Sequence, residues 1–178
     1  LTLMLFGIVL RGTAFVFRSY GSEYDAKQQR WGRVFAIASI VTPVLLGMCV
    51  GAIATGNIDP AMFTGGFGGS FADAFIAPWL TTFGFGVGLL ALALFSFRAA
   101  GERTGEAEGT ELQDDFRARA LWAAAAVFVI ALAPFSLSMR EAPMVRRACM
   151  AGPWALPLQI VTGVAAVTAI GALFARLF

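Results

Sequence analysis

The stretch VFAIASIVTPVLLGMCVGAIATG, residues 34–56, contains no charged residue. Three further stretches share this property, namely residues 75–97, 120–139 and 148–175. A helix needs about 20 predominantly apolar residues to cross a hydrocarbon core of ~30 Å, and each of these stretches is long enough. Buried helices of soluble proteins rarely run so long without a charge, so these stretches predict membrane-spanning helices.

The composition agrees with this interpretation. Of the 178 residues, 58% are hydrophobic and 13% are charged, and the mean hydropathy is +0.77. Soluble domains are usually about half apolar and about a quarter charged. We therefore expect an all-α, polytopic transmembrane helix bundle that forms a single domain over residues 1–178. The expected spans are about 1–17, 34–56, 76–97, 119–138 and 154–175, with a polar cytoplasmic loop at 98–118.

The basic residues predict the orientation of the bundle. Segments 11–33 and 98–119, together with Arg176, carry all of the Lys and Arg residues except Arg140, Arg146 and Arg147. Alternating spans place these two segments and Arg176 on one side of the membrane. Because cytoplasmic loops are enriched in Lys and Arg, we expect that side to be cytoplasmic.

The side chains present exclude several kinds of chemistry. The chain has two cysteines and no histidine, so it cannot form a four-thiolate metal cluster and lacks the commonest ligand of haem and zinc. The glycine-rich segment TGGFGGSF, residues 64–71, lacks the Lys-Ser/Thr ending of a phosphate-binding loop. We expect no metal site in this chain and no nucleic-acid partner.

One stripe of residues follows the second predicted span. A step of four residues advances about 40° beyond a full helical turn, so its members adjoin and the stripe winds slowly around the helix. Two glycines in it allow close backbone approach. A proline frees a carbonyl, and the serine one turn earlier is expected to satisfy local backbone groups. The stripe consists of Trp31, Phe35, Ser39, Pro43, Gly47 and Gly51.

The order of three segments resembles a known family. These are RGTAFVFR at 11–18, YDAKQQRWGRVF at 24–35 and SIVTPVLLGMCVGAIATGNI at 39–58. Together they are similar to subunit II of the cytochrome bd-type quinol oxidases, in which a helix ends in R-G-x-A-F-[E/D]-[F/Y]-R. The segments DDFRARALWAAAAVFVIALA at 114–133 and WALPLQIVTG at 154–163 also resemble the family. Its members usually have eight spans, so the resemblance implies a chain that lacks its N-terminal spans.

The resemblance implies a function in respiration. The family oxidises membrane quinol and reduces dioxygen to water in the bacterial cytoplasmic membrane. Haem b and haem d are expected in the haem-bearing subunit I, and no cofactor is expected to bind directly to this chain apart from a structural quinone that the family allows. Subunit II is expected to support the haem subunit and the cytoplasmic proton supply. A small single-span subunit, membrane lipid and quinol are the further expected partners.

Two positions of RGTAFVFR raise distinct questions. Val16 stands where the family pattern has an acid, and valine cannot carry a proton. For Arg11, snorkelling to the interface, an ion pair with the partner subunit and contact with substrate all remain open. Arg18 and Trp31 are most simply a cytoplasmic anchor and part of an interfacial aromatic belt. A small-molecule transporter core and a catalytically inert membrane scaffold are the alternative functions.

Overall fold

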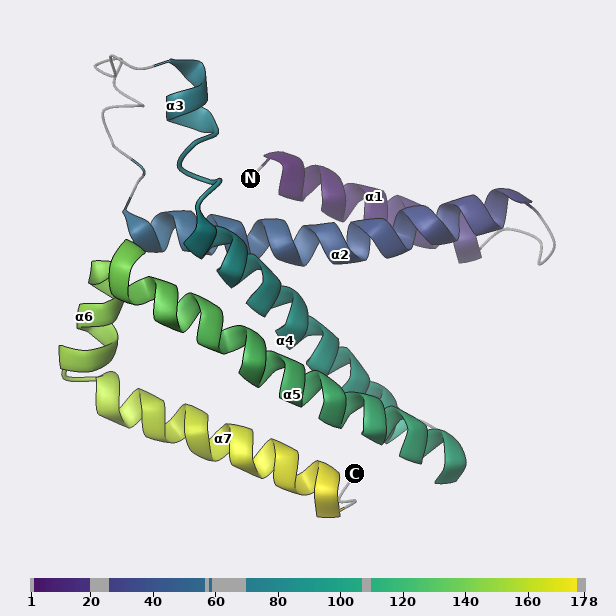
Figure 1. Cartoon of the computed structure of the whole chain (residues 1–178). Helices are drawn as coiled ribbons and strands as arrows, with labels where there is room; N and C mark the ends of the chain where they lie inside the picture. Colours follow the sequence, from purple (N-terminus) through teal and green to yellow (C-terminus); the bar gives the residue numbers. More distant parts are fainter. Residues whose placement is uncertain (1, 20–25, 57, 59–69, 107–109, 176–178) are drawn as a thin grey trace.

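Helices make up every regular element that the computed structural model describes, which covers residues 2–19, 26–56, 58, 70–106 and 110–175 (Figure 1). The all-α prediction is confirmed. The helices are α1 (Thr2–Ser19), α2 (Ala26–Thr55), α3 (Phe71–Phe75), α4 (Thr82–Glu106), α5 (Thr110–Glu141), α6 (Pro143–Ala151) and α7 (Ala155–Ala175).

Four of the described helices are long and apolar enough to cross a membrane. They cover Gln29–Thr55, Thr82–Thr104, Leu112–Glu141 and Ala155–Ala175. A shorter apolar helix, Thr2–Phe17, corresponds to the first expected span. The helices therefore form the polytopic bundle that the uncharged stretches predict.

The polar segment 98–118 is not the loop that the sequence suggests. α4 continues to Glu106 and α5 begins at Thr110, so only residues 107–109 lie outside the described helices. Opposite charges three or four residues apart favour a helix, which offsets the polar composition. Three such pairs occur here: Arg98–Glu102 at 3.0 Å, Asp115–Arg119 at 2.9 Å and Asp114–Arg117 at 3.6 Å.

The third expected span also begins later than residue 76. α4 starts at Thr82, and the preceding residues form the short helix α3 and a turn that contains Pro78. Proline lacks a backbone N–H group and disfavours a helical residue before it. The Thr81 hydroxyl then accepts a hydrogen bond from the N–H of Gly84 at 2.9 Å, which caps the new helix.

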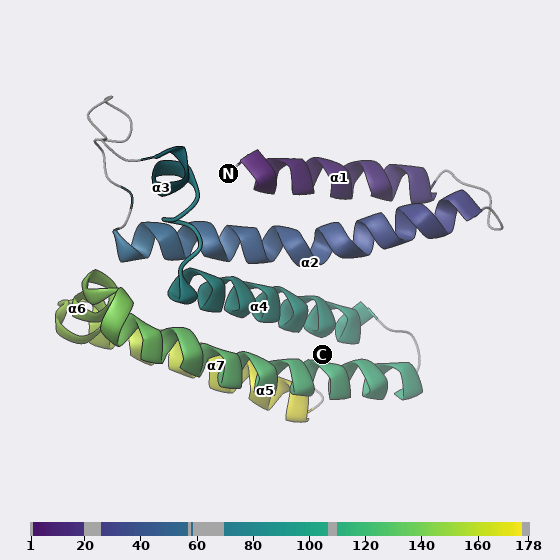
Figure 2. The same cartoon turned by 45° about the horizontal axis from the view of Figure 1, so that its top comes forward.

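The long helices pack in chain order and alternate in direction (Figures 1 and 2). α2 packs between α1 and α4, and α4 packs between α2 and α5. We call the side where α1 ends and α2 begins the basic end. The opposite side, which holds α3 and α6, is the far end (Figure 2).

The interior of the bundle lies around α2 and α4. In their most apolar windows 28% of the residues are buried, against 11% in α5 and 6% in α7. Within α7, Ala155 and Leu173 are the buried residues. The apolar side chains of α5 and α7 therefore face outward, where lipid or another subunit can cover them.

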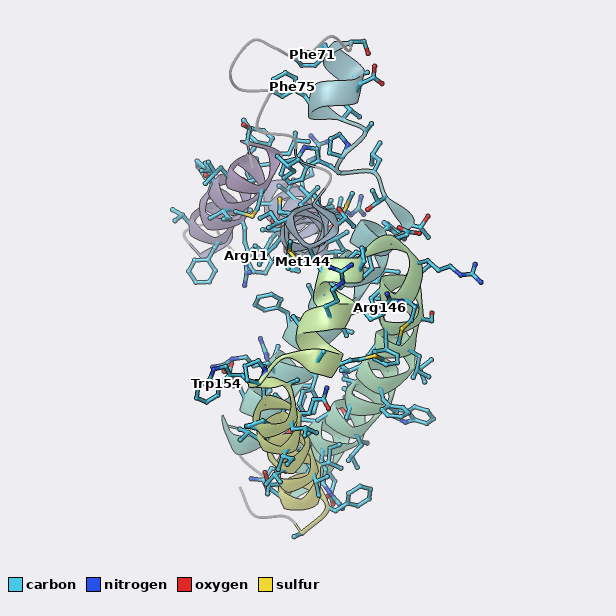
Figure 3. The ribbon with its side chains drawn as sticks, turned by 90° about the vertical axis from the view of Figure 1, so that its left-hand side faces the viewer. Arg11, Phe71, Phe75, Met144, Arg146 and Trp154 are labelled. Atoms are coloured by element: carbon cyan, nitrogen blue, oxygen red, sulfur yellow. The ribbon has the colours of Figure 1, made fainter. Side chains whose placement is uncertain are left out.

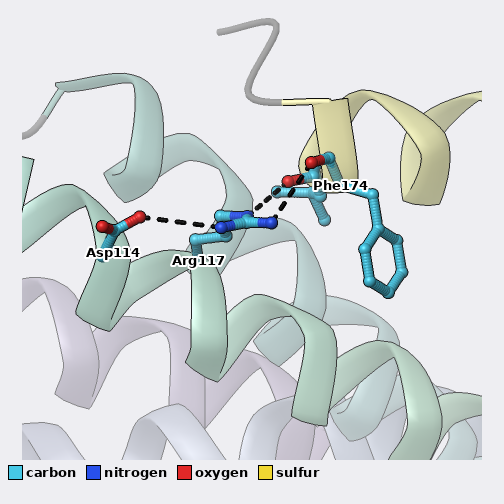
Figure 4. A network of polar contacts seen from close by, with 4 residues as sticks. Asp114, Arg117 and Phe174 are labelled. Atoms are coloured by element: carbon cyan, nitrogen blue, oxygen red, sulfur yellow. Dashed lines mark hydrogen bonds and ion pairs between the residues drawn. The ribbon is translucent and has the colours of Figure 1, made fainter.

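Polar contacts fix both ends of α7. At the basic end, Arg117 Nε donates to the carbonyl oxygen of Leu173 at 2.6 Å and Arg117 Nη2 donates to that of Phe174 at 3.2 Å (Figure 4). At the far end, Gln159 Nε2 donates to the carbonyl oxygen of Cys149 at 2.7 Å. These contacts position a helix that has few buried side chains.

Candidate functional site

The stripe on α2 contacts two different helices. Near the start of the stripe, Trp31 stacks on Phe17 of α1, with the ring centroids 4.8 Å apart. Phe35 lies 6.4 Å from the ring of Phe15, also on α1. At its last part, Gly47 and Gly51 face α4. The slow winding expected from the four-residue spacing thus carries the stripe from one neighbour to the other.

Glycine meets glycine where α2 crosses α4. A Cβ atom built on Gly47 would lie 2.6 Å from the Cα of Gly88, and one built on Gly51 would lie 2.6 Å from the Cα of Gly84. Both distances are below any real Cβ contact, so these positions require glycine. The sequence indicated Gly47 and Gly51, whereas Gly84 and Gly88 were missed. Their own four-residue spacing in GFGVG could have indicated them.

Between these two contact regions, the middle of the stripe lines a polar groove of about 480 Å³. Ser39, Thr42 and Pro43 come from α2, Arg11 from α1, and Arg98 and Glu102 from α4. We call it the polar groove. It lies toward the basic end, and it brings together three of the residues singled out in the sequence: Arg11, Ser39 and Pro43.

Two hydroxyl groups in the polar groove lack a hydrogen-bond partner among the described residues. Ser39 Oγ and Thr42 Oγ1 are both buried. The expectation that Ser39 satisfies the backbone near Pro43 is therefore wrong. A buried hydroxyl without a partner costs about 1–3 kcal/mol in proteins, so both groups need water or a ligand. Thr42 was not indicated by the sequence.

Arg11 is exposed, and its guanidinium carbon lies 5.6 Å from the centre of the Phe35 ring. This is the distance of a cation–π contact. Within the described part of the chain, Arg11 forms no ion pair. Figure 3 shows where its side chain lies beside the bundle. The aromatic contact holds the charge beside the polar groove, a role that none of the three sequence interpretations contained.

Glu102 supplies the carboxylate of the polar groove. It pairs with Arg98 at 3.0 Å, and the side chain of Glu102 remains 61% exposed. The carboxylate is therefore open to solvent while it pairs with Arg98. Sequence reasoning missed Glu102 because it placed this segment in a loop, and the signal was the i,i+4 spacing to Arg98.

The remaining residues of RGTAFVFR lie outside the polar groove. Val16 is 50% exposed on α1 and does not line the groove. Arg18 belongs to α1, but its side chain lies outside the described residues. The position that carries an acid in the family pattern is thus not a wall of the groove.

The chain offers few of the ligands that proteins most often use for haem and metal clusters. The 178 residues contain no histidine. Across the described ranges, no group of three or more Cys, Asp or Glu side chains could hold a metal ion.

A comparison with known protein families identifies one that covers this chain. The whole chain, residues 1–178, matches the family described as cytochrome bd terminal oxidase subunit II. The chain belongs to that family. No individual curated protein and no solved structure matches it.

Membership of the subunit II family defines the general role of this chain. It is a multi-pass integral membrane protein and a subunit of a respiratory terminal oxidase. A complex of this kind carries haem and includes a subunit I. A bundle whose outer helices are largely exposed and apolar suits a chain that packs against other subunits and lipid.

Proposed function

We propose that this chain is the non-haem-ligating subunit of a bd-type oxidase that oxidises quinol and reduces dioxygen to water. Haem b and haem d are held by subunit I, and this chain supports that subunit and supplies protons to it from the cytoplasm. The polar groove, with its two unpartnered hydroxyls, is the observation that carries the proton role.

Water is the simplest partner for the two hydroxyls. Inside a membrane an unsatisfied polar group costs several kcal/mol, roughly as in other apolar surroundings. A hydroxyl both donates and accepts a hydrogen bond, so Ser39 and Thr42 can each hold one water and pass a proton along it. Neither hydroxyl ionises, so both residues can pass a proton on but cannot store one.

Glu102 is the group that takes up the proton. It is reached by solvent, and it lines the same groove as Ser39 and Thr42. In this proposal it supplies the acidic group that the family pattern has at position 16 and that this chain, with Val16, lacks there. The guanidinium groups of Arg11 and Arg98 line the same groove as this carboxylate.

The orientation follows from the distribution of charge. Among the described residues, the helix ends at the basic end carry Arg30, Arg33, Arg98, Arg103, Arg117 and Arg119, whereas the far end carries Arg140, Arg146 and Arg147. By the positive-inside rule the basic end faces the cytoplasm. The polar groove then opens on the cytoplasmic side of a bacterial inner membrane, from which the protons come.

An apolar pocket at the far end suits the structural quinone that the family allows. Its volume is about 530 Å³, and Trp79, Phe71 and Phe75 contribute to its wall. Phe71 and Phe75 stack with ring centroids 4.8 Å apart and leave aromatic faces beside the pocket. Such faces favour a flat ring with an apolar tail.

The complete oxidase, purified with subunit I, tests the proposal. The double variant Ser39→Ala/Thr42→Val should leave the haem b and haem d absorption bands unchanged. Quinol-driven oxygen consumption and proton uptake by proteoliposomes should both fall severalfold, and Glu102→Gln should act in the same way. Ser136→Ala is the matched control, because that hydroxyl already donates to the carbonyl oxygen of Ala133 at 2.8 Å.

The outcomes separate the parts of the proposal. A purified complex without haem bands or quinol oxidase activity would refute the oxidase role. Unchanged turnover and proton uptake in both variants would refute the proton role but not the oxidase role. The chain would then be a structural subunit, which is the scaffold alternative. Membership of an oxidase family already argues against the transporter alternative.

A further inference from the structure

Helix α6 joins α5 to α7 at the far end and differs from the other helices. It spans Pro143–Ala151, and none of its residues is buried. Met144 and Met150 expose 73% and 60% of their surfaces, and Arg146 and Arg147 lie between them in sequence. Figure 3 shows Met144 and Arg146 on α6. A short exposed helix that mixes arginine with large apolar side chains is typical of a membrane interface.

A groove of about 430 Å³ runs from α6 between α4 and α5. Arg146 is the one charged residue that lines it, at the α6 end. The wall below is apolar and includes Val87, Leu90, Phe128 and Leu132. We call it the α6 groove. The α6 groove therefore has a positive charge at its opening and an apolar wall along its length.

The length of the α6 groove matches one leaflet of a bilayer. Along α5 its lining extends from Phe128 to Met139. At 1.5 Å per residue this distance is about 16 Å. Half of a hydrocarbon core is about 15 Å thick. An acyl chain that enters at the interface can therefore lie along the whole groove.

The charge at the mouth is available to a ligand. Arg146 Nη1 reaches the carbonyl oxygen of Met139 only at 3.5 Å, and Arg146 forms no ion pair with any described carboxylate. The nearest acid in sequence, Glu141, accepts a hydrogen bond from the N–H of Phe83 at 3.0 Å. Arg140 and Arg147 are also exposed, but neither of them lines the α6 groove.

We propose that the α6 groove binds an anionic phospholipid, with its phosphate on Arg146 and one acyl chain between α4 and α5. A quinone carbonyl oxygen can accept a hydrogen bond from the arginine, but a phosphate also carries negative charge and forms stronger, charge-assisted hydrogen bonds with a guanidinium. The inference does not depend on the proton role of the polar groove, which lies toward the opposite end of the helices.

The test uses the complete oxidase purified in mild detergent and exchanged into lipid nanodiscs. One nanodisc preparation contains phosphatidylglycerol and phosphatidylcholine in equal amounts. Native mass spectrometry then measures how much of each lipid stays bound after the complex is released. The unmodified complex should retain phosphatidylglycerol preferentially. Arg146→Gln should lower this retention about fivefold, because one arginine near an anionic lipid contributes about 1 kcal/mol.

Two further variants make the result specific. Arg140→Gln removes the same charge at the same end but does not line the α6 groove, so it should change retention little. Ala131→Phe fills the groove and should lower retention of both lipids while Arg146 stays in place. Equal retention by Arg146→Gln and the unmodified complex would overturn the proposal. So would equal binding of the two lipids, or a bound quinone in place of a lipid.

Discussion

Gly51 of α2 and Gly84 of α4 face each other across the interior of the bundle. A Cβ atom on Gly51 would lie 2.6 Å from the Cα of Gly84. Glycine at both positions lets the backbones approach far more closely than side chains would allow. This contact holds together the two helices that line most of the polar groove.

Gly51→Ala should destabilise the complex, because the new methyl group would meet the backbone of α4. Overpacking of this kind typically costs about 1–3 kcal/mol. The midpoint of thermal unfolding of the purified oxidase should therefore fall. Gly163→Ala is the matched control, since no atom lies within 4 Å of a Cβ built there. Equal midpoints for the two variants would show that the helices separate at little cost.

Arg117→Gln should loosen the last turn of α7. The wild-type guanidinium donates to the carbonyl oxygens of Leu173 and Phe174 (Figure 4). Hydrogen bonds from charged donors contribute about 1.5–3 kcal/mol. Amide hydrogen exchange in residues 171–175 should become at least about tenfold faster, which corresponds to 1.4 kcal/mol.

Arg119→Gln provides the control for this prediction. Arg119 forms a pair with Asp115 at 2.9 Å, but its side chain is 66% exposed. Exposed pairs contribute little to stability. Unchanged exchange in Arg117→Gln, or equal acceleration in both variants, would contradict a specific role for Arg117.

Glu141→Ala should weaken the start of α4. The Glu141 carboxylate at the end of α5 accepts a hydrogen bond from the N–H of Phe83, one of the free donors of the first turn. Loss of a side-chain cap costs about 0.5–2 kcal/mol. The thermal midpoint of the oxidase should fall, and exchange should quicken at residues 83–86. Asp115→Ala, which removes an exposed acid, should have a smaller effect on both measurements.

The short helix α3 should depend on pH through Asp73. The Ser70 hydroxyl donates to the Asp73 carboxylate at 2.7 Å and, with the Ser70 backbone N–H at 3.1 Å, lowers the pKa of Asp73. A lowered pKa in the folded state means that the ionised form stabilises α3. That stabilisation is complete at neutral pH and is lost as the pH falls below the usual carboxyl value of about 4.

Ser70→Ala tests this account directly. This substitution removes the side-chain hydrogen bond, which lowers the pKa of Asp73 more than the backbone hydrogen bond does. The pKa of Asp73 should therefore rise toward its usual value. A titration of isotope-labelled aspartate by NMR measures the change. An unchanged pKa in Ser70→Ala would mean that the hydroxyl does not hold the carboxylate in the complex.

Several features of the fold could be predicted because they depend on neighbouring residues alone. The uncharged stretch at 34–56 became the main part of α2, and the four-residue stripe correctly indicated Gly47 and Gly51 as sites of close packing. The segment 98–118 was misjudged, because its polarity suggested a loop while its charge spacing favoured a helix.

The polar groove could not be predicted in the same way. Ser39 and Arg11 were indicated as separate candidates, but Thr42 and Glu102 became relevant only when α1, α2 and α4 were placed together. Likewise, the pairing of Arg117 with the end of α7 joins residues 56 positions apart. No local pattern reports which distant side chains will meet.

The sequence by itself determined that this chain is a helical membrane protein, because the partition of a segment into hydrocarbon depends on its own length and composition. It also carried the resemblance that the family match confirmed. The tertiary structure decided where polar groups are left without partners and where an arginine borders an apolar groove. Those properties depend on which helix faces cover one another, and backbone contacts such as Gly51 with Gly84 set that arrangement.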